Sequence, residues 1–255
     1  MHYMRFEDGR WEMLDGQVAS EELVRLHVNG RELTRWMCTP QELDWLALGF
    51  LYSEGIISSM ADVRLVKVCP SRTCVEVWLR DAHFEPPSRV TMTSGCGGGV
   101  TFADILARAE PLEADVRVTP QQLSRLMQAM LASQQMRGAH TAALAQGETL
   151  LVVSEDVGRH NAVDKVGGYC LQHNISTAGC ILLCTGRISS EMLYKAARME
   201  VPVVVSRTSP TSLSVALAEA WHMTLVGHVR RASLNVYAGR ERIIVDEEET
   251  TDAYS

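Results

Sequence analysis

The stretch TLLVVSEDVGRHNAVDKV, residues 149–166, decides the fold class of this chain, because it leads from an apolar, strand-like run through a polar loop into a helix. Strands and helices alternate on both sides of it. Segments typical of strands lie at 141–145, 149–153, 180–184, 201–206, 224–229 and 234–238, and segments typical of helices lie at 160–171, 190–199 and 212–222. Such alternation predicts an α/β fold, with helices on both faces of a sheet that is largely parallel over its middle strands.

The beginning of the chain is richer in strands. LVRLHV (23–28) and RELTRWMC (31–38) predict a hairpin, because Asn29-Gly30 between them accepts positive φ at both turn positions. TPQE (39–42) is typical of a helical capping box with proline at the first helical position. We therefore expect a helix directly after the hairpin, ending at Gly55.

Two units follow from these patterns. We assign the β-rich first unit to residues 1–112. It also contains strand-like runs at 63–68 and 74–79 and a glycine-rich loop. A second capping box, TPQQ (119–122), opens a new helix. Residues 113–255 are then the α/β unit.

Composition restricts the function classes. The 255 residues are 46% hydrophobic and carry a net charge of −7. A general nucleic-acid or anionic-membrane binder needs a basic surface, so we expect neither kind of partner. No run approaches the roughly 18 apolar residues of a membrane span, and the charged start lacks the apolar core of a signal peptide. We expect a soluble, cytoplasmic protein.

Cysteine usage points to one unusual thiol. The cysteines are Cys38, Cys69, Cys74, Cys96, Cys170, Cys180 and Cys184. In the cytosol they are expected to be reduced. Structural zinc sites generally combine two clustered half-sites, which neither the Cys69/Cys74 pair nor the Cys180/Cys184 pair offers, so we expect no metal. Apart from Cys96 and the Cys69/Cys74 pair, we expect the cysteines to be small buried hydrophobes.

Cys96 lies in MTSGCGGGV, residues 92–100, among four glycines and with no apolar residue within three positions. Glycine gives a backbone that moves and intrudes little. It also lets backbone N–H groups approach a thiolate, which favours the charged, nucleophilic form. We interpret Cys96 as a reactive thiol rather than an incidental loop cysteine.

Polar residues gather in four loops that follow predicted strands. These loops are SEDVGRHN (154–161), TGRISSE (185–191), SRTSPT (206–211) and GHVRRAS (227–233). Each carries arginine, whose planar fork fits phosphate, and helix starts add free N–H groups. Since ligands bind outside the carboxyl ends of strands in such a sheet, the loops predict a site for a phosphorylated or nucleotide-like ligand. The candidates are Arg159, His160, Arg187, Ser206 and Arg207.

Further polar residues lie close to these loops in the sequence. His160 fits a general base, a ligand hydrogen bond or a helix-start role equally well, because no nucleophile stands beside it. Glu155 and Asp156 are expected to orient arginines. Asp164 and Lys165, on the following helix, are predicted to lie on a solvated face.

Several motifs together closely resemble the FdhD family of formate dehydrogenase accessory sulfurtransferases. They are SGCG (94–97), EDVGRHNAVDK (155–165), TGRISSEM (185–192) and SRTSPT (206–211). The resemblance runs from the hairpin through LALGFLYSEGII (46–57) to about residue 243. It implies a cytidine-deaminase-like three-layer α/β/α fold for the second unit and a homodimer. It also implies binding of the bis-molybdopterin guanine dinucleotide form of the molybdenum cofactor, with GDP as a mimic.

The resemblance implies an activity as well. Such a protein receives sulfur as a persulfide from a cysteine desulfurase and passes it to that cofactor, without which formate dehydrogenase stays inactive. The family's persulfide cysteine falls on Cys96. Its cofactor-binding segment falls on His228, Val229, Arg230, Arg231, Ala232 and Ser233.

The sequence departs from the family pattern in two places. Gly99 stands where many relatives have a second cysteine, which argues against a mechanism that uses two cysteines of this loop. His228 stands where an aromatic residue is common, and RAS (231–233) replaces a Pro-Gly-Arg-like run, so the side-chain contacts stay open. Because this second cysteine is missing, we retain an alternative function, that of a chaperone that binds the cofactor without covalent chemistry. A zinc nucleoside deaminase is excluded, because that chemistry needs a Pro-Cys-x-x-Cys pair, which the chain lacks.

Overall fold

A six-stranded sheet forms the centre of the second unit in the computed structural model, which describes residues 2–16, 18–86, 91–92, 100–101 and 111–245. In spatial order its strands are β10 (Thr149–Asp156), β9 (His140–Gln146), β11 (Ile181–Cys184), β12 (Val203–Ser206), β13 (Thr224–Gly227) and β14 (Asn235–Ala238). β11, β12 and β13 are parallel, and the other pairings are antiparallel. The predicted parallel middle of the sheet is confirmed.

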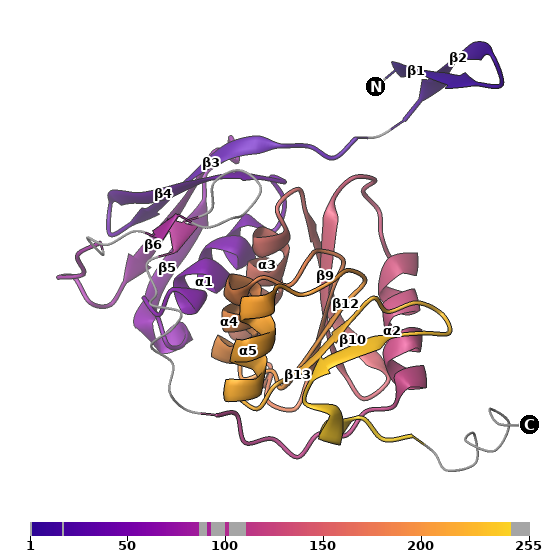
Figure 1. Cartoon of the computed structure of the whole chain (residues 1–255). Helices are drawn as coiled ribbons and strands as arrows, with labels where there is room; N and C mark the ends of the chain where they lie inside the picture. Colours follow the sequence, from indigo (N-terminus) through magenta and orange to yellow (C-terminus); the bar gives the residue numbers. More distant parts are fainter. Residues whose placement is uncertain (1, 17, 87–90, 93–99, 102–110, 246–255) are drawn as a thin grey trace, which may run out of the picture.

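Helices cover both faces of this sheet, as predicted (Figure 1). One face carries α3 (Arg159–Gln172), α4 (Ser190–Arg198) and α5 (Ser212–Ala220), and the other carries α2 (Pro120–Ala132). Successive strand side chains point to opposite faces of the sheet. Leu182 packs in the core on the face that α3, α4 and α5 cover, and Leu183 packs in the core on the face that α2 covers. The α/β fold class is confirmed, and its cytidine-deaminase-like character stays a prediction.

The first unit is a four-stranded sheet with one helix on its inner face. The strands in spatial order are β4 (Arg31–Cys38), β3 (Glu22–Val28), β6 (Cys74–Leu79) and β5 (Val63–Val68), and the helix is α1 (Leu43–Ser53). Asn29 and Gly30 have φ of 50° and 78°, so the predicted β3–β4 hairpin is confirmed. Short elements complete the chain: η1 (Met60–Asp62), β7 (Thr91–Met92), β8 (Val100–Thr101) and η3 (Arg240–Arg242).

The predicted capping box before α1 is wrong. The helix begins at Leu43, after Glu42 in the left-handed region, with no side-chain cap. Thr39 is used elsewhere: its backbone N–H donates to Asp156 Oδ2 over 3.1 Å, and its hydroxyl accepts from the Val157 N–H over 3.3 Å. Contacts with the second unit thus override the local pattern. The predicted stop at Gly55 is confirmed, with a φ of 70°.

Two glycines bring α1 and α3 into backbone contact. A Cβ on Gly49 would lie 1.8 Å from the Asp164 carbonyl oxygen, and a Cβ on Gly168 would lie 1.9 Å from that of Trp45. Only glycine fits at such a crossing, because any side chain would overlap the facing backbone. The division of the chain at residue 112 stays a prediction, and α1 of the first unit packs directly on α3 of the second.

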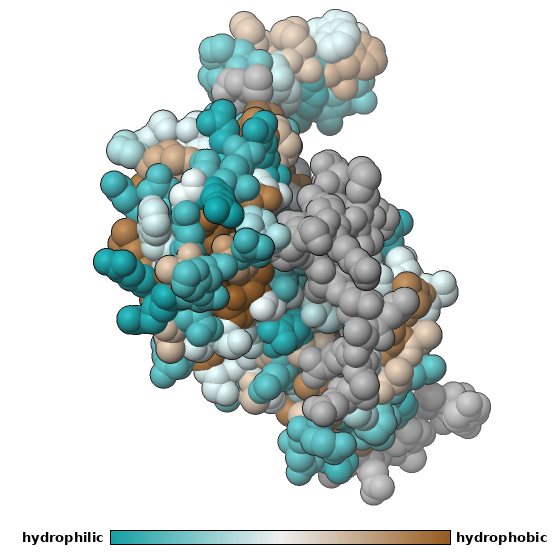
Figure 2. Space-filling model, turned by 90° about the vertical axis from the view of Figure 1, so that its left-hand side faces the viewer, coloured by the Kyte–Doolittle hydropathy of each residue, from teal (hydrophilic) through white to brown (hydrophobic). Residues whose placement is uncertain are grey.

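A further hairpin, β1 (His2–Glu7) with β2 (Arg10–Asp15), was not predicted and stands apart from the body (Figures 1 and 2). Its turn is Asp8-Gly9, with φ of 50° and 78°. The strand register places four exposed apolar side chains on one face, Met4, Phe6, Trp11 and Met13. The opposite face carries the Arg5–Glu12 ion pair at 2.8 Å. The hairpin is therefore amphipathic.

Candidate functional site

The strand register brings the four polar loops to one edge of the sheet. Ser154 pairs with Ala142, Ala142 with Cys184, and Cys184 with Ser206. Val205 pairs in turn with Val226 in β13. The ends of β10, β11, β12 and β13 are therefore level with one another. The loops that follow these strands start side by side.

Hydrogen bonds join neighbouring loops in series. The buried Ser206 hydroxyl donates to the Gly186 carbonyl over 2.7 Å. The His228 N–H donates to the Thr208 carbonyl over 3.0 Å, and the Arg230 guanidinium donates to the Arg207 carbonyl over 2.6 Å. The loops after β11, β12 and β13 are thus one connected surface.

The loop after β10 joins this surface through the start of α3. His160 Nδ1 lies 3.1 Å from the Glu191 carboxylate at the start of α4. The contact fixes the imidazole ring, and His160 Nε2 is buried without a hydrogen-bond partner among the described residues. Gly186 lies against Arg159: a Cβ on Gly186 would be 2.9 Å from the Arg159 Cβ. Any side chain at position 186 would push the buried Arg159 away from this edge.

His140 belongs to the same group, and sequence reasoning missed it. It lies at the start of β9, paired with Asp156 at the end of β10, and a Cβ on Gly186 would lie 3.4 Å from its Nδ1. Burial and the nearby Arg159 charge lower the pKa of His140, so its imidazole is neutral at pH 7. The direction of β9 would have revealed His140. β9 is antiparallel to its neighbours, so its first residue lies at the edge of the sheet where the neighbouring strands end.

The residues of the candidate segment 228–233 differ in burial. His228 is half-buried with a φ of 53°, and the Val229 side chain is buried in the core under α2. Arg230 N–H donates to the Ser233 carbonyl over 2.8 Å, which closes a turn. The four residues from Arg230 to Ser233 are exposed at this edge. Their contacts with a cofactor stay a prediction.

The remaining arginine candidates differ in exposure. Arg187 is exposed in the loop after β11, and Arg207, which directly follows β12, is half-buried. Ser206 also accepts the Thr208 N–H over 3.0 Å, so its hydroxyl positions the backbone of two loops. A binding role for these three residues stays a prediction.

The predicted solvated face of α3 is wrong. Lys165 is fully buried and pairs with the buried Asp156 at 2.8 Å. Asp164 is buried and pairs with Lys195 of α4 at 2.8 Å, while the Ser53 hydroxyl of α1 donates to it over 2.8 Å. Helices α1 and α4 pack against α3, so this part of it does not reach water. Each of these buried charges faces an opposite charge, which offsets part of the cost of removing it from water.

Asp156 and Glu155 hold backbone in place. Asp156 Oδ1 accepts the Gly158 N–H over 2.8 Å and the Asn161 amide over 2.9 Å, at the start of α3. The Glu155 carboxylate accepts the Met136 N–H over 3.0 Å, in the segment after α2. These carboxylates anchor the loop that carries Arg159 and His160.

The buried cysteines are confirmed. Cys38, Cys170, Cys180 and Cys184 are all buried and free. Burial raises the pKa of Cys38 and Cys170 to about 12 and that of Cys184 to about 11, so these thiols are protonated at neutral pH. Cys96 lies outside the described residues. Within the described ranges there is no group of three or more His, Cys, Asp and Glu residues placed to hold a metal ion.

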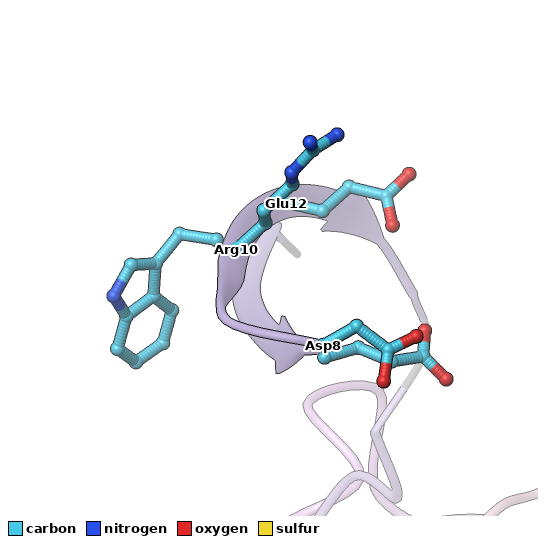
Figure 3. A pocket seen from close by; sticks show the side chains of 5 residues that line it. Asp8, Arg10 and Glu12 are labelled. Carbon is cyan, nitrogen blue, oxygen red and sulfur yellow. The ribbon is translucent and has the colours of Figure 1, made fainter.

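A hollow of about 500 Å³ lies away from this edge, on the β1–β2 hairpin. Figure 3 shows that the labelled side chains of Asp8, Arg10 and Glu12 extend outward from the hairpin without meeting at one point. Polar groups that do not converge offer little specificity for a ligand. We do not interpret this hollow as a binding site. None of the helices that the structure describes is long and apolar enough to cross a membrane.

Comparison with known proteins agrees with this arrangement. The model of the FdhD/NarQ family matches residues 19–244. A protein of Staphylococcus aureus strain MRSA252 named sulfur carrier protein FdhD is 36% identical over 254 residues, covering 96% of both chains. Its counterpart in strain Newman is 35% identical over the same share of both chains.

A solved structure is also similar. It is described as a formate dehydrogenase accessory protein from Desulfotalea psychrophila and superimposes with a TM-score of 0.79 at 31% identity. The match covers 96% of this chain and 98% of that one. Together with the family match over residues 19–244, this similarity establishes that the chain belongs to the FdhD/NarQ family.

Proposed function

We propose that this protein is a cytoplasmic sulfurtransferase that carries persulfide sulfur from a cysteine desulfurase to the bis-molybdopterin guanine dinucleotide cofactor, which formate dehydrogenase needs for activity. The cofactor is the substrate here. The observation that carries the proposal is the common edge at which four arginine-bearing loops start. The names of the similar proteins, a sulfur carrier and a formate dehydrogenase accessory protein, support it.

The edge offers donors of the kind that bind phosphate groups, which supports the proposal. Arg159, Arg187, Arg207 and Arg230 come from four loops that the register and hydrogen bonds bring together. Guanidinium groups and helix N-termini favour phosphate oxygens. The Glu191 contact at Nδ1 fixes the His160 ring, and its buried Nε2 has no hydrogen-bond partner among the described residues. These residues would hold the phosphate part of the substrate.

Sulfur transfer needs a thiolate, and the sequence offers Cys96. Its thiolate attacks the outer sulfur of the desulfurase persulfide, and the desulfurase cysteine leaves as a thiolate with the electron pair of the broken S–S bond. Cys96 then carries the persulfide to the cofactor. The four buried cysteines do not fit this role, because burial keeps their thiols protonated and inaccessible.

The direct test is a mass measurement after incubation with a cysteine desulfurase and cysteine. The peptide that contains Cys96 is expected to gain one sulfur, and a reductant should remove it. A protein that binds the cofactor but never gains this sulfur would be the non-covalent chaperone instead. That result would overturn the transfer step and keep the binding step.

Replacing Arg187 with alanine is expected to weaken GDP binding by about 1.5–3 kcal/mol, the usual effect of losing a hydrogen bond to a charged group. Isothermal titration calorimetry measures the affinity. Arg125→Ala is the matched control, because Arg125 is also exposed but pairs with Glu148 near α2 and β10. Equal GDP affinity in Arg187→Ala and the unaltered protein would remove Arg187 from the site.

A homodimer is the expected assembly. The cofactor carries two guanine dinucleotide arms, and a two-fold arrangement offers one site for each arm. Light scattering at micromolar concentration should give about twice the chain mass of 28.2 kDa. A species of single-chain mass alone would contradict this expectation.

A further inference from the structure

The turn between β5 and β6, CPSRTC (69–74), surrounds a second cysteine sulfur with donors. The Cys74 backbone N–H donates to Cys69 Sγ over 2.9 Å. The Ser71 hydroxyl lies 3.3 Å from the same sulfur, and the Thr73 hydroxyl lies 4.0 Å from it. The Ser71 and Thr73 hydroxyls lie 2.8 Å from each other, so their positions are coupled. The turn is arranged to stabilise a negative charge on Cys69.

The ionisation of the two thiols follows from these contacts. Burial acts to raise the pKa of Cys69, but hydrogen bonds from Cys74, Ser71 and Thr73 outweigh it and lower the pKa to about 6. The contact with Cys69 raises the pKa of Cys74 to about 11. At neutral pH Cys69 is therefore a thiolate and Cys74 a thiol, which differs from the four buried and protonated cysteines.

Cys69 also opens into a cavity. The cavity has a volume of about 290 Å³ and lies between the β5–β6 turn and the start of α1, with Arg72, Glu42 and Asp44 among the residues that line it. Both Cys69 and Cys74 are half-buried, so reagents from solution reach them. A small molecule with both positive and negative groups finds charges of both signs here. The cavity has room for the leaving part of a small sulfur donor.

We propose that Cys69, in the donor-rich turn and at the cavity beside α1, is a second sulfur-accepting thiol that takes sulfane sulfur from a low-molecular-weight persulfide. The choice of persulfide as the substrate class rests on the proposed function. Cys74, on the opposite strand, is the thiol that releases the sulfur again. Neither residue takes part in the Cys96 step described above.

The chemistry balances in two steps. The Cys69 thiolate attacks the outer sulfur of the donor R–S–S–H, a new S–S bond forms, and the donor leaves as R–S⁻ with the electron pair of the broken bond. Cys74 then loses its proton to water and attacks Cys69 Sγ, which expels HS⁻. The sulfane sulfur is reduced to sulfide while the two thiols are oxidised to a disulfide. Because Cys74 keeps its proton at neutral pH, this second step is slow and the Cys69 persulfide persists.

Trypsin makes the test unambiguous. Cleavage after Lys67, Arg72, Arg80, Arg89 and Arg108 places Cys69, Cys74 and Cys96 in three different peptides. The whole protein is incubated at pH 6.5 with glutathione persulfide, alkylated and digested. The peptide 68–72 should gain one sulfur, which a reductant removes. No gain on 68–72 would overturn the inference, whereas the proposed function is read separately, as desulfurase-dependent sulfur on the Cys96 peptide.

A hydrogen-bond variant tests the cause of the reactivity. In Ser71→Ala the loss of one donor to the charged sulfur is expected to raise the Cys69 pKa from about 6 by about one unit, so the thiolate fraction and the loading rate at pH 6.5 fall about threefold. Thr73→Val is the matched control, because its hydroxyl lies farther from the sulfur and its loss should slow loading less. Equal loading rates in Ser71→Ala and the unaltered protein would contradict a role of the turn.

The pH profile of alkylation gives an independent readout. A group with a lowered pKa is ionised above that pKa, so the iodoacetamide reaction of Cys69 should rise to half its maximal rate near pH 6. An ordinary thiol would reach half its maximal rate near pH 8.5. A midpoint for the 68–72 peptide in the ordinary range would overturn the assignment of Cys69 as the thiolate.

Discussion

Replacing Cys96 with alanine is expected to abolish activation of formate dehydrogenase. Transfer requires a thiolate that attacks the donor persulfide, and alanine provides no nucleophile. The nearest other cysteines in the sequence are Cys74 and Cys170, so no neighbouring thiol in residues 92–100 replaces Cys96. Folding and GDP binding should stay close to those of the unaltered protein, because the sequence surrounds Cys96 with glycines rather than apolar partners.

The measurement is formate dehydrogenase activity in cells or extracts that depend on this protein for sulfur transfer. Cys96→Ser is the size-matched control and should fail equally, because a hydroxyl does not form a persulfide. Thermal unfolding and GDP titration show that both variants are folded. Full enzyme activation by folded Cys96→Ala would mean that another thiol carries the sulfur.

The second large effect is expected for Gly168→Ala, at the crossing of α1 and α3. The added Cβ would lie 1.9 Å from the Trp45 carbonyl oxygen, a backbone atom that cannot rotate away. The two helices must separate, which costs packing on both sides of the crossing. We expect the free energy of unfolding to fall by about 3 kcal/mol or more, at the upper end for added volume in a packed interior. Denaturant unfolding followed by circular dichroism measures it.

Gly167→Ala is the matched control in the same helix. There the nearest atom to an added Cβ is the Met199 sulfur at 3.3 Å, the flexible end of a side chain. Alanine is also favoured over glycine inside a helix by about 0.5–1 kcal/mol. Gly167→Ala should therefore change stability little or increase it. If the two alanine variants have similar stability, the helices do not cross at Gly168 as described.

Local patterns predicted the secondary structure well where local contacts decide it. Thr119 caps α2 through a capping box with Gln122, as its sequence predicts. Thr39 has a similar pattern and does not cap α1, because Asp156 and Val157 take up its hydrogen-bonding groups from 117 and 118 residues away. Local sequence does not distinguish these two cases. In the β1–β2 hairpin, by contrast, the local sequence does indicate the structure. Asp8-Gly9 is typical of a hairpin turn, although the hairpin was not predicted.

The candidate site was likewise predicted from the sequence only in part. The arginine-bearing loops were recognisable because each follows a strand, and parallel strands end at one edge. His140 was missed because only the antiparallel pairing of β9 brings its first residue to that edge. The burial of Asp164 and Lys165 was missed because their partners come from other elements, Lys195 of α4 and the end of β10. Charges in a sequence are ordinarily solvated unless distant partners bury them.

The contacts between α1 and α3 have a consequence for the order of events during synthesis. The Ser53–Asp164, Thr39–Asp156 and Lys165–Thr39 hydrogen bonds join residues 111, 117 and 126 positions apart. A chain that leaves the ribosome at about 5–20 residues per second exposes its first half for several seconds before these partners exist. During this interval the first unit has its own sheet and the apolar core under α1. The Gly49 face of α1 packs on α3, which has not yet been synthesised at this stage. Folding of the first unit is therefore completed only with the second half of the protein.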